Sequence, residues 1–339
     1  MGNILAIETS CDETAVAIVR EGREVVADLV ASQVEIHARY GGVVPEIASR
    51  QHLLALNPLV RRALTEANLT WENISALAVT QGPGLVGALL IGVTSAKAIA
   101  WALGKPLVAV NHMAGHIYAN MLAGPIEFPL VCLVVSGGHT ELIYMERDLD
   151  FQILGQTRDD AAGETYDKVA RVMGLGYPGG VRVDKLAQEG RETYSFPRVY
   201  LEEGTLDFSF SGLKTAVINH IHNSRQKGEE LVLPDLAASF QQAVVEVLVE
   251  KTSQAVSKYK PATLLLAGGV AANSGLRQAL AQRAKLLGVP LAVPPLKYCT
   301  DNAAMIGAAA WPLFQRGQLG NFELNADPSL FLGKNAVIP

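Results

Sequence analysis

Short apolar runs separated by polar turns open the chain. Residues 3–8 and 14–19 are apolar and β-prone, and the polar stretch 9–13 lies between them. This pattern predicts a β-hairpin with an acidic, polar tip, and residues 24–30 supply a third apolar run. Residues 46–67 carry apolar side chains at helical spacing, which predicts a helix.

Strands and helices then alternate. Residues 74–84 read as a strand that ends in a Gly-Pro-Gly turn, and residues 106–110 form a second strand. The apolar stretch 85–104 between them ends in glycine, so we interpret it as a buried helix with a glycine C-cap and not as a membrane span. Asn111 is placed to cap the helix that carries the sequence NHMAGHIYANML.

The second half repeats this order. Residues 128–145 predict a strand, a tight glycine turn and a second strand, and helical patterns follow at 162–173 and 183–189. A polar, turn-rich stretch covers 190–212. The remaining predicted elements are a helix capped by Asp235 and running to Tyr259, a strand, glycine turn and helix over 263–288, a short strand at 290–295, and a last helix within 299–314.

Each half therefore opens with a strand–turn–strand unit and continues with alternating strands and helices. This order predicts a duplicated α/β fold with parallel strand pairs covered by helices, and a cleft between the halves. We place the boundary near Gly124-Pro125, which gives domains at 1–125 and 126–339, with the last helix as a candidate to pack back on the N-terminal domain.

Composition narrows the class of protein. Apolar residues make up 49% of the 339 residues and charged residues 18%, so the chain is globular. The net charge of −5 and the absence of a basic run mean that RNA binding would need a local patch or a partner. Three scattered cysteines without a CxxC pair argue against a disulfide scaffold, and Glu8 interrupts the apolar start that a signal peptide needs. We expect a soluble, cytoplasmic protein.

The most specific candidate for a functional site is the pair His112 and His116. Residues four apart on a helix share one face, so both imidazoles can reach one metal ion, although two buried histidines bonded to backbone are an equally common reading. The pair is not HExxH, since Met113 stands where a metallopeptidase has its glutamate, and this disfavours a peptidase. Asp301 is the best candidate for a third ligand, but its spacing alone favours an ordinary N-cap.

Three glycine turns follow strands, at residues 81–84, 136–138 and 268–269. None is a P-loop or a GxGxxG motif, yet glycines let the backbone approach a ligand, and together with the polar tip Glu8–Glu13 they suggest a nucleotide site. Asn273 either caps the following helix or contacts a ribose or base, and capping is the safer reading. The Ser211/Lys214 spacing matches the SxxK of serine acylases but lacks the partner motifs.

Ten segments of the chain together resemble a known family. They are IETSCDETAVAIV, GGVVPEIASRQH, GPGLVGALL, NHMAGH, VSGGHTEL, DDAAGETYDKVAR, YPGG, LDFSFSGLKTAV, AGGVAANSGLR and CTDNAAMI. The resemblance covers about residues 3 to 316 and identifies the chain as similar to the bacterial TsaD proteins, once described as O-sialoglycoprotein endopeptidases. Within NHMAGH only Ala114 departs, where the family usually has an acid.

The resemblance implies the actin/Hsp70-like (ASKHA) ATPase fold, with two RNase H-like domains and a nucleotide cleft. It implies transfer of threonylcarbamoyl from threonylcarbamoyl-AMP to the exocyclic N6 amine of the adenosine next to the anticodon, in tRNAs that read codons starting with A. It makes Asp301 the third ligand, beside His112 and His116, of one divalent metal ion, with iron(II) favoured and zinc(II) as the other candidate. The residues it assigns to the adenylate are Val134, Val135, Ser136, Gly137, Gly138, Asp167, Gly180, Asp184 and Asn273.

The resemblance also implies partners: tRNA, a TsaB-like paralogue and a TsaE-like ATPase, with no membrane and no DNA. Two alternative functions stay open on the sequence, a metallo-glycopeptidase and a non-catalytic, nucleotide-dependent scaffold. The attacking adenosine amine is almost non-basic, and we name no general base.

Overall fold

The computed structural model describes residues 2–201 and 204–332, and within them the chain forms two compact units. Unit 1 takes in residues 2–126, 148–151 and 293–332, and unit 2 takes in 127–147 and 152–292 apart from 202–203. The outer ends of the two predicted domains, residue 1 and residues 333–339, lie outside the described residues.

Unit 1 is built on a five-stranded sheet in the order β3-β2-β1-β4-β5. β1 and β2 form the predicted antiparallel hairpin, and β4 and β5 extend the sheet with parallel pairing. The third apolar run forms the edge strand β3, antiparallel to β2. The bounds are β1 Asn3–Glu8, β2 Glu13–Arg20, β3 Glu24–Ser32, β4 Ile74–Gly82 and β5 Leu107–Asn111.

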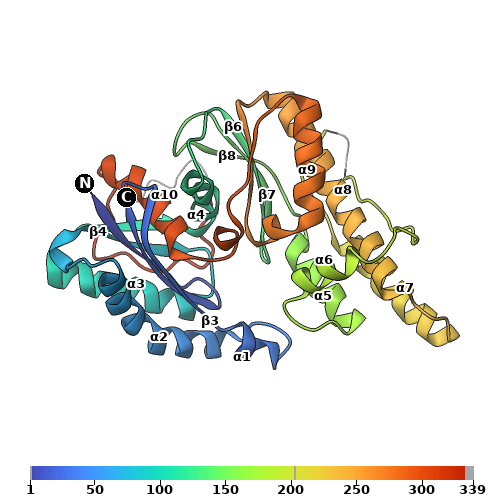
Figure 1. Ribbon diagram of the computed structural model, residues 1–339, viewed down its shortest axis with the longest axis horizontal. Coiled ribbons are helices and arrows are strands. Elements are labelled where there is room, and N and C mark those ends of the chain that lie inside the picture. The colour runs from blue at the N-terminus through green and yellow to red at the C-terminus, as the bar shows by residue number, and fades with distance from the viewer. Residues whose placement is uncertain (1, 202–203, 333–339) are drawn as a thin grey trace. The chain divides into compact units, whose positions relative to one another are not determined.

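Helices cover both faces of this sheet, and every residue of β1 is buried for that reason. α2 and α3 pack on each other and on the face that carries Leu5 and Ile7 (Figure 1). α10 packs on the opposite face, where a Cβ on Gly307 would meet Ala6 and Val19. The bounds are α1 Val34–Ala38, α2 Pro45–Glu66, α3 Val86–Leu103, α4 His112–Tyr118 and α10 Ala303–Gln315, with short 3₁₀ turns at Trp71–Asn73, Ala119–Leu122 and Leu296–Tyr298.

Unit 2 repeats the sheet with the order β10-β9-β6-β7-β8. Its hairpin β6–β7 is antiparallel, and β9 and β10 follow with parallel pairing. The bounds of the strands are β6 Leu130–Val135, β7 Thr140–Met145, β8 Phe151–Gln156, β9 Thr263–Ala267 and β10 Leu291–Ala292. Those of the helices are α5 Ala162–Met173, α6 Gly179–Ala187, α7 Ser211–Lys227, α8 Leu233–Tyr259 and α9 Ser274–Leu287, with a 3₁₀ turn (η3) at Gly269–Ala272.

The two sheets have the same topology when read from the hairpin outward. β6, β7 and β8 take the places of β1, β2 and β3, and β9 and β10 take those of β4 and β5. This correspondence confirms the predicted duplicated α/β fold. The sequence pattern missed α1, β8 and α7, and the predicted Asp235 cap is wrong, because α8 begins earlier and Asp235 instead accepts hydrogen bonds from Arg191 N and Thr193 Oγ1.

The apolar helix α3 ends at Gly104 in the left-handed conformation, as its predicted C-cap requires. By length and composition it is the one described helix that could cross a membrane, although core helices of the same kind share these properties. One third of its length is buried, on the face that packs against α2 and β4, so the helix is embedded on one side only.

Candidate metal centre and substrate residues

His112 and His116 stand one turn apart on α4, in unit 1. Asn111 caps this helix as predicted, because its side-chain oxygen accepts from the backbone N–H groups of Met113 and Ala114 at 2.8 and 3.3 Å. The cap fixes the start of the helix directly after β5, and both histidines are buried there. The sequence therefore places the two imidazoles on one helical face with little local freedom.

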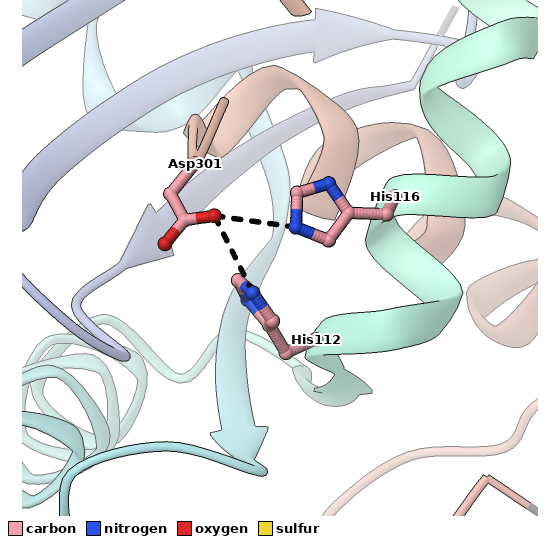
Figure 2. A group of neighbouring side chains, drawn as sticks. All are labelled: His112, His116 and Asp301. Carbon is pink, nitrogen blue, oxygen red and sulfur yellow. Dashed lines mark ion pairs between the residues drawn. The ribbon is translucent and has the colours of Figure 1, made fainter. Parts of the chain in front are cut away.

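Asp301 lies next to both histidines. Its Oδ1 is 3.4 Å from Nε2 of His112 and 3.2 Å from Nε2 of His116, and Figure 2 shows the two rings converging on this one oxygen. The N-cap reading of Asp301 is wrong, because Asn302 caps α10 by accepting from Met305 N at 2.9 Å. Asp301 thus precedes the helix, and its carboxylate is directed at the histidines.

The spacing of these atoms suits a metal ion. One donor atom from each of the three residues can be chosen so that all lie within 4.8 Å of one another. Two ligand atoms at about 2.1 Å from one metal ion, at angles near 90–110°, are about 3.0–3.4 Å apart. The two nitrogen-to-oxygen distances around Asp301 match that separation.

Comparison with other buried histidines points the same way. His37 bonds to Gln33 and Val44 N, and His52 bonds to Thr14 and the Cys11 carbonyl, so both rings have hydrogen-bond partners on each nitrogen. His116 is just as buried, yet neither of its nitrogens makes a hydrogen bond within the described residues. Nε2 of this ring has the Asp301 carboxylate 3.2 Å away as an ion-pair partner but no hydrogen bond among the described residues, and a metal ion held between the two would satisfy both groups.

Glu8 supports His112 from the other side, a contact that sequence reasoning missed. Its Oε2 lies 3.1 Å from Nδ1 of His112 and accepts from Thr80 Oγ1 at 2.5 Å, while its Oε1 accepts from Ser10 N. A carboxylate on Nδ1 favours the tautomer whose Nε2 lone pair faces a metal. The signal that could have revealed it is a charged residue at the end of a fully buried strand.

The charges in this cluster favour a cation. Burial opposes ionisation of all three groups, but the Asp301 and Glu8 carboxylates raise the pKa of His112 well above its ordinary value. Conversely, His112 lowers the pKa of Glu8, and His112 with His116 lowers that of Asp301, in both cases against the effect of burial. Two carboxylates held ionised in a buried place attract positive charge, whether a proton or a metal ion.

The first group of predicted adenylate residues lies where β6 turns into β7. Val134 and Val135 end β6, and the turn is closed by hydrogen bonds between Ser136 and His139. A Cβ added to Gly137 or Gly138 would meet nothing within 4 Å, so this side of the turn is open.

The second group surrounds α6. Asp167 accepts from Gly179 N at 2.7 Å and so holds the start of that helix, and a Cβ on Gly180 would meet only Tyr166 Cβ, at 4.0 Å. Asn273 caps α9, as its safer reading predicted, by accepting from Leu276 N. Asp184 and Asn273 are brought together by a residue that the sequence analysis did not single out, Gln241, which bonds to both.

The SxxK match has a structural explanation. Lys214 forms an ion pair with Asp160, which also pairs with Lys168. Asp159 accepts from the backbone N–H of Ser211 and of the residue before it, and so fixes the start of α7. These contacts give Asp159, Asp160 and Lys214 structural roles, so the SxxK spacing can be explained without acylase activity.

The sequence is similar to that of known proteins over almost its whole length. A sequence profile of the family described as TsaD, tRNA N6-adenosine threonylcarbamoyltransferase, matches residues 24–308. Proteins named tRNA N6-adenosine threonylcarbamoyltransferase from Geobacillus thermodenitrificans and Staphylococcus aureus are 58% and 55% identical to it, over 96% and 97% of this chain and 96% of each relative.

Among solved structures, HypF from T. kodakarensis superposes over 93% of this chain and 48% of its own, with a TM-score of 0.63 and 14% identity, which is a likeness of fold alone. The topology agrees with the expected actin/Hsp70-like fold. On the near full-length identity to its relatives, the chain belongs to the TsaD family, the transferases that place a threonylcarbamoyl group on N6 of adenosine in tRNA.

Proposed function

We propose that this transferase takes threonylcarbamoyl from threonylcarbamoyl-AMP and delivers it to the adenosine next to the anticodon in tRNAs reading codons that start with A, with a metal ion held by His112, His116 and Asp301. The observation that carries the metal is the buried ring of His116, which makes no hydrogen bond within the described residues and lies 3.2 Å from the Asp301 carboxylate. Two histidines and one carboxylate with open positions are a ligand set of both iron(II) and catalytic zinc(II) sites. We propose iron(II) first, on the family resemblance, with zinc(II) as the other candidate.

A bound metal ion supplies Lewis acidity toward carbamoyl or phosphate oxygens. The residues of the chain position that chemistry: Asp301 and the two histidines hold the ion, and Glu8 orients His112. In the reaction the adenosine N6 attacks the carbamoyl carbon, the bond from that carbon to the AMP phosphate oxygen breaks, and N6 gives up a proton. AMP is a good leaving group, so the residues in contact with it need to bind and orient more than to activate it.

Unit 2 supports the adenylate part of the proposal. The glycines at 137, 138 and 180 leave the backbone open to a ligand, while the turn and helix that carry them are held by their own hydrogen bonds. Backbone N–H groups next to glycine are suited to phosphate and carboxylate groups. We assign Val134–Gly138, Asp167, Gly180, Asp184 and Asn273 to the donor.

The low positive charge of the chain bears on how tRNA is held. A net charge of −5 provides little counterion release on RNA binding, so affinity of the isolated chain for tRNA should be weak. A TsaB-like paralogue and a TsaE-like ATPase would supply the tRNA platform and reset the site after each turnover. A tRNA substrate and three free cysteines support a cytoplasmic enzyme, which is part of the proposal.

The test is formation of threonylcarbamoyladenosine on unmodified tRNA, measured by mass spectrometry of the nucleosides, with each partner omitted in turn and the salt concentration varied. We expect multiple turnovers only with both partners present. Multiple turnovers by the isolated chain at physiological salt would refute partner dependence. No product in any combination, together with cleavage of a glycoprotein, would restore the peptidase alternative.

A further inference from the structure

Gln241 occupies the centre of a buried polar cluster in unit 2. It lies in the middle of the described hydrogen-bond network between α6, α8 and α9 and is itself 7% exposed. Its Nε2 donates to Asp184 Oδ1 at 3.0 Å, and its Oε1 accepts from Asn273 Nδ2 at 2.7 Å and from Tyr166 Oη at 3.5 Å. One amide therefore joins residues from elements other than its own helix.

Asp184 and Asn273, two of the three partners of this amide, also bond to other groups. Asp184 also accepts from the backbone N–H and the hydroxyl of Ser274, at 3.1 and 2.8 Å. The Asn273 oxygen accepts from Leu276 N, so its amide nitrogen is the end left for Gln241. These bonds fix which way each amide points, because an ionised carboxylate can only accept.

The site selects for glutamine by its donor and acceptor pattern. One end must donate to a carboxylate while the other accepts from an amide, which an ionised glutamate cannot do. Gly275 makes the room: a Cβ there would lie 2.9 Å from Gln241 Nε2 and 3.4 Å from Asn273 Oδ1. A residue with no bonding groups would fill the space but remove one hydrogen bond from Asp184 and leave the buried Asn273 amide nitrogen without its partner.

We propose that Gln241 is a positioning residue for the adenylate donor, which sets the side-chain orientations of Asp184 and Asn273 so that both face the ligand together. The inference rests on the proposed function, since that assigns Asp184 and Asn273 to the donor. Gln241 acts through these two residues, and its loss should weaken donor binding without disturbing the metal cluster, whose residues all belong to unit 1.

The experiment measures binding of AMP to the full-length protein by calorimetry, with metal content and thermal unfolding followed in parallel. We expect Gln241→Met to weaken AMP binding about tenfold, the size typical for loss of a buried hydrogen-bonding partner. Gly275→Ala adds a Cβ that would lie 2.9 Å from the same amide nitrogen, and this variant should also weaken AMP binding. Metal content per subunit should not change in either variant.

Gln241→Glu separates hydrogen bonding from space filling, because glutamate has nearly the shape of glutamine. In this variant an ionised side chain would face the Asp184 carboxylate, whereas a protonated one can donate to it again. The ratio of the variant's Kd to the wild-type Kd should therefore be larger at pH 8 than at pH 6. The control is Gln242→Glu: the exposed neighbour donates to Glu246 at 2.9 Å, and its variant should bind like wild type at both pH values.

Two results would overturn the inference in different ways. If Asp184→Ala and Asn273→Ala weaken AMP binding but Gln241→Met and Gln241→Glu do not, the positioning role is wrong and the proposed function stands. If all four variants bind AMP like wild type, the assignment of the donor to Asp184 and Asn273 fails, and the role of Gln241 falls with it.

Discussion

The polar clusters of the two units differ in whether their side chains have hydrogen-bond partners within the cluster. In unit 1, His112, His116 and Asp301 converge on a point, and the His116 ring has no hydrogen-bond partner within the described residues. In unit 2, Asp184, Gln241 and Asn273 satisfy one another, and openness to a ligand comes from glycines. On the proposed function, a bound cation completes the first cluster. The second cluster is held together by its own hydrogen bonds.

This difference predicts how a substitution in each cluster should affect the protein. Removing any one of the three proposed ligands in unit 1 leaves a cation one donor fewer, so metal affinity should fall. In unit 2, Asp184 and Asn273 each keep other hydrogen bonds when Gln241 is changed, so the fold there should hold. Variants in unit 1 should therefore act on metal content, and variants in unit 2 on adenylate affinity.

The largest expected effect is loss of the metal. His116→Ala and Asp301→Ala should lower metal affinity by about 10²–10³-fold, since bound zinc shares roughly 10–16 kcal/mol among four ligands. Elemental analysis of the purified variants measures this. His37→Ala is the matched control, because that buried histidine has partners on both nitrogens and should leave the metal in place. Full metal occupancy in His112→Ala and His116→Ala alike would contradict the site.

Glu141 in unit 2 also has a buried side-chain oxygen without a hydrogen bond in the described part of the chain, and its ionisation can be tested. Its Oε2 has no hydrogen bond within the described residues, and burial raises the pKa of this carboxyl to about 7. Because the folded-state pKa is raised, the native protein binds the proton over a wider range than the unfolded chain. Stability therefore falls as pH rises from about 4.5 to about 7 and is level above that.

Glu141→Gln removes this titration, so its unfolding free energy relative to wild type should rise with pH over that window, by at most about 3 kcal/mol. Denaturant unfolding at about pH 4.5, 6 and 8 gives the difference directly. A difference between the two proteins that is constant over this range would show that Glu141 ionises normally.

Two glycines of unit 2 separate ligand approach from backbone strain. Gly137→Val projects into open space and should keep the fold, yet crowd the donor and weaken AMP binding. Gly268→Ala should destabilise by about 1–3 kcal/mol, since its φ is +90° and a Cβ would lie 2.4 Å from the Val135 carbonyl oxygen. Calorimetry and thermal unfolding measure the two effects. Unchanged AMP affinity in Gly137→Val would mean that the turn does not touch the ligand.

The smallest expected effect comes from the helix caps behind the metal ligands. Asn111→Ala and Asn302→Ala should each cost about 1 kcal/mol of unfolding free energy. Both caps hold a ligand-bearing segment, so a modest drop in metal affinity should accompany the loss. Asn273→Ala, which removes a cap from α9 in unit 2, should cost about as much stability and leave metal affinity unchanged.

Particular elements show which parts of the fold could be predicted from the sequence. The hairpins β1–β2 and β6–β7 were predictable because short apolar runs around a polar turn favour local antiparallel pairing. The α4 histidine pair and its Asn111 cap followed from helical spacing and cap chemistry. By contrast α7 was missed, because its N-terminus is fixed by Asp159, some fifty residues away in the chain, and not by a cap of its own.

By itself, then, the sequence determined the local elements, the two histidines on one helical face and the resemblance to a family of tRNA-modifying transferases. Only the tertiary structure decided that Asp301 faces both histidines, that Glu8 holds His112, and that Gln241 joins Asp184 to Asn273. The physical reason is the separation of the contacting residues along the chain. Periodicity and capping act between residues a few positions apart, whereas these contacts join residues 32 to 189 positions apart, and only the packed sheets and helices bring them within bonding distance.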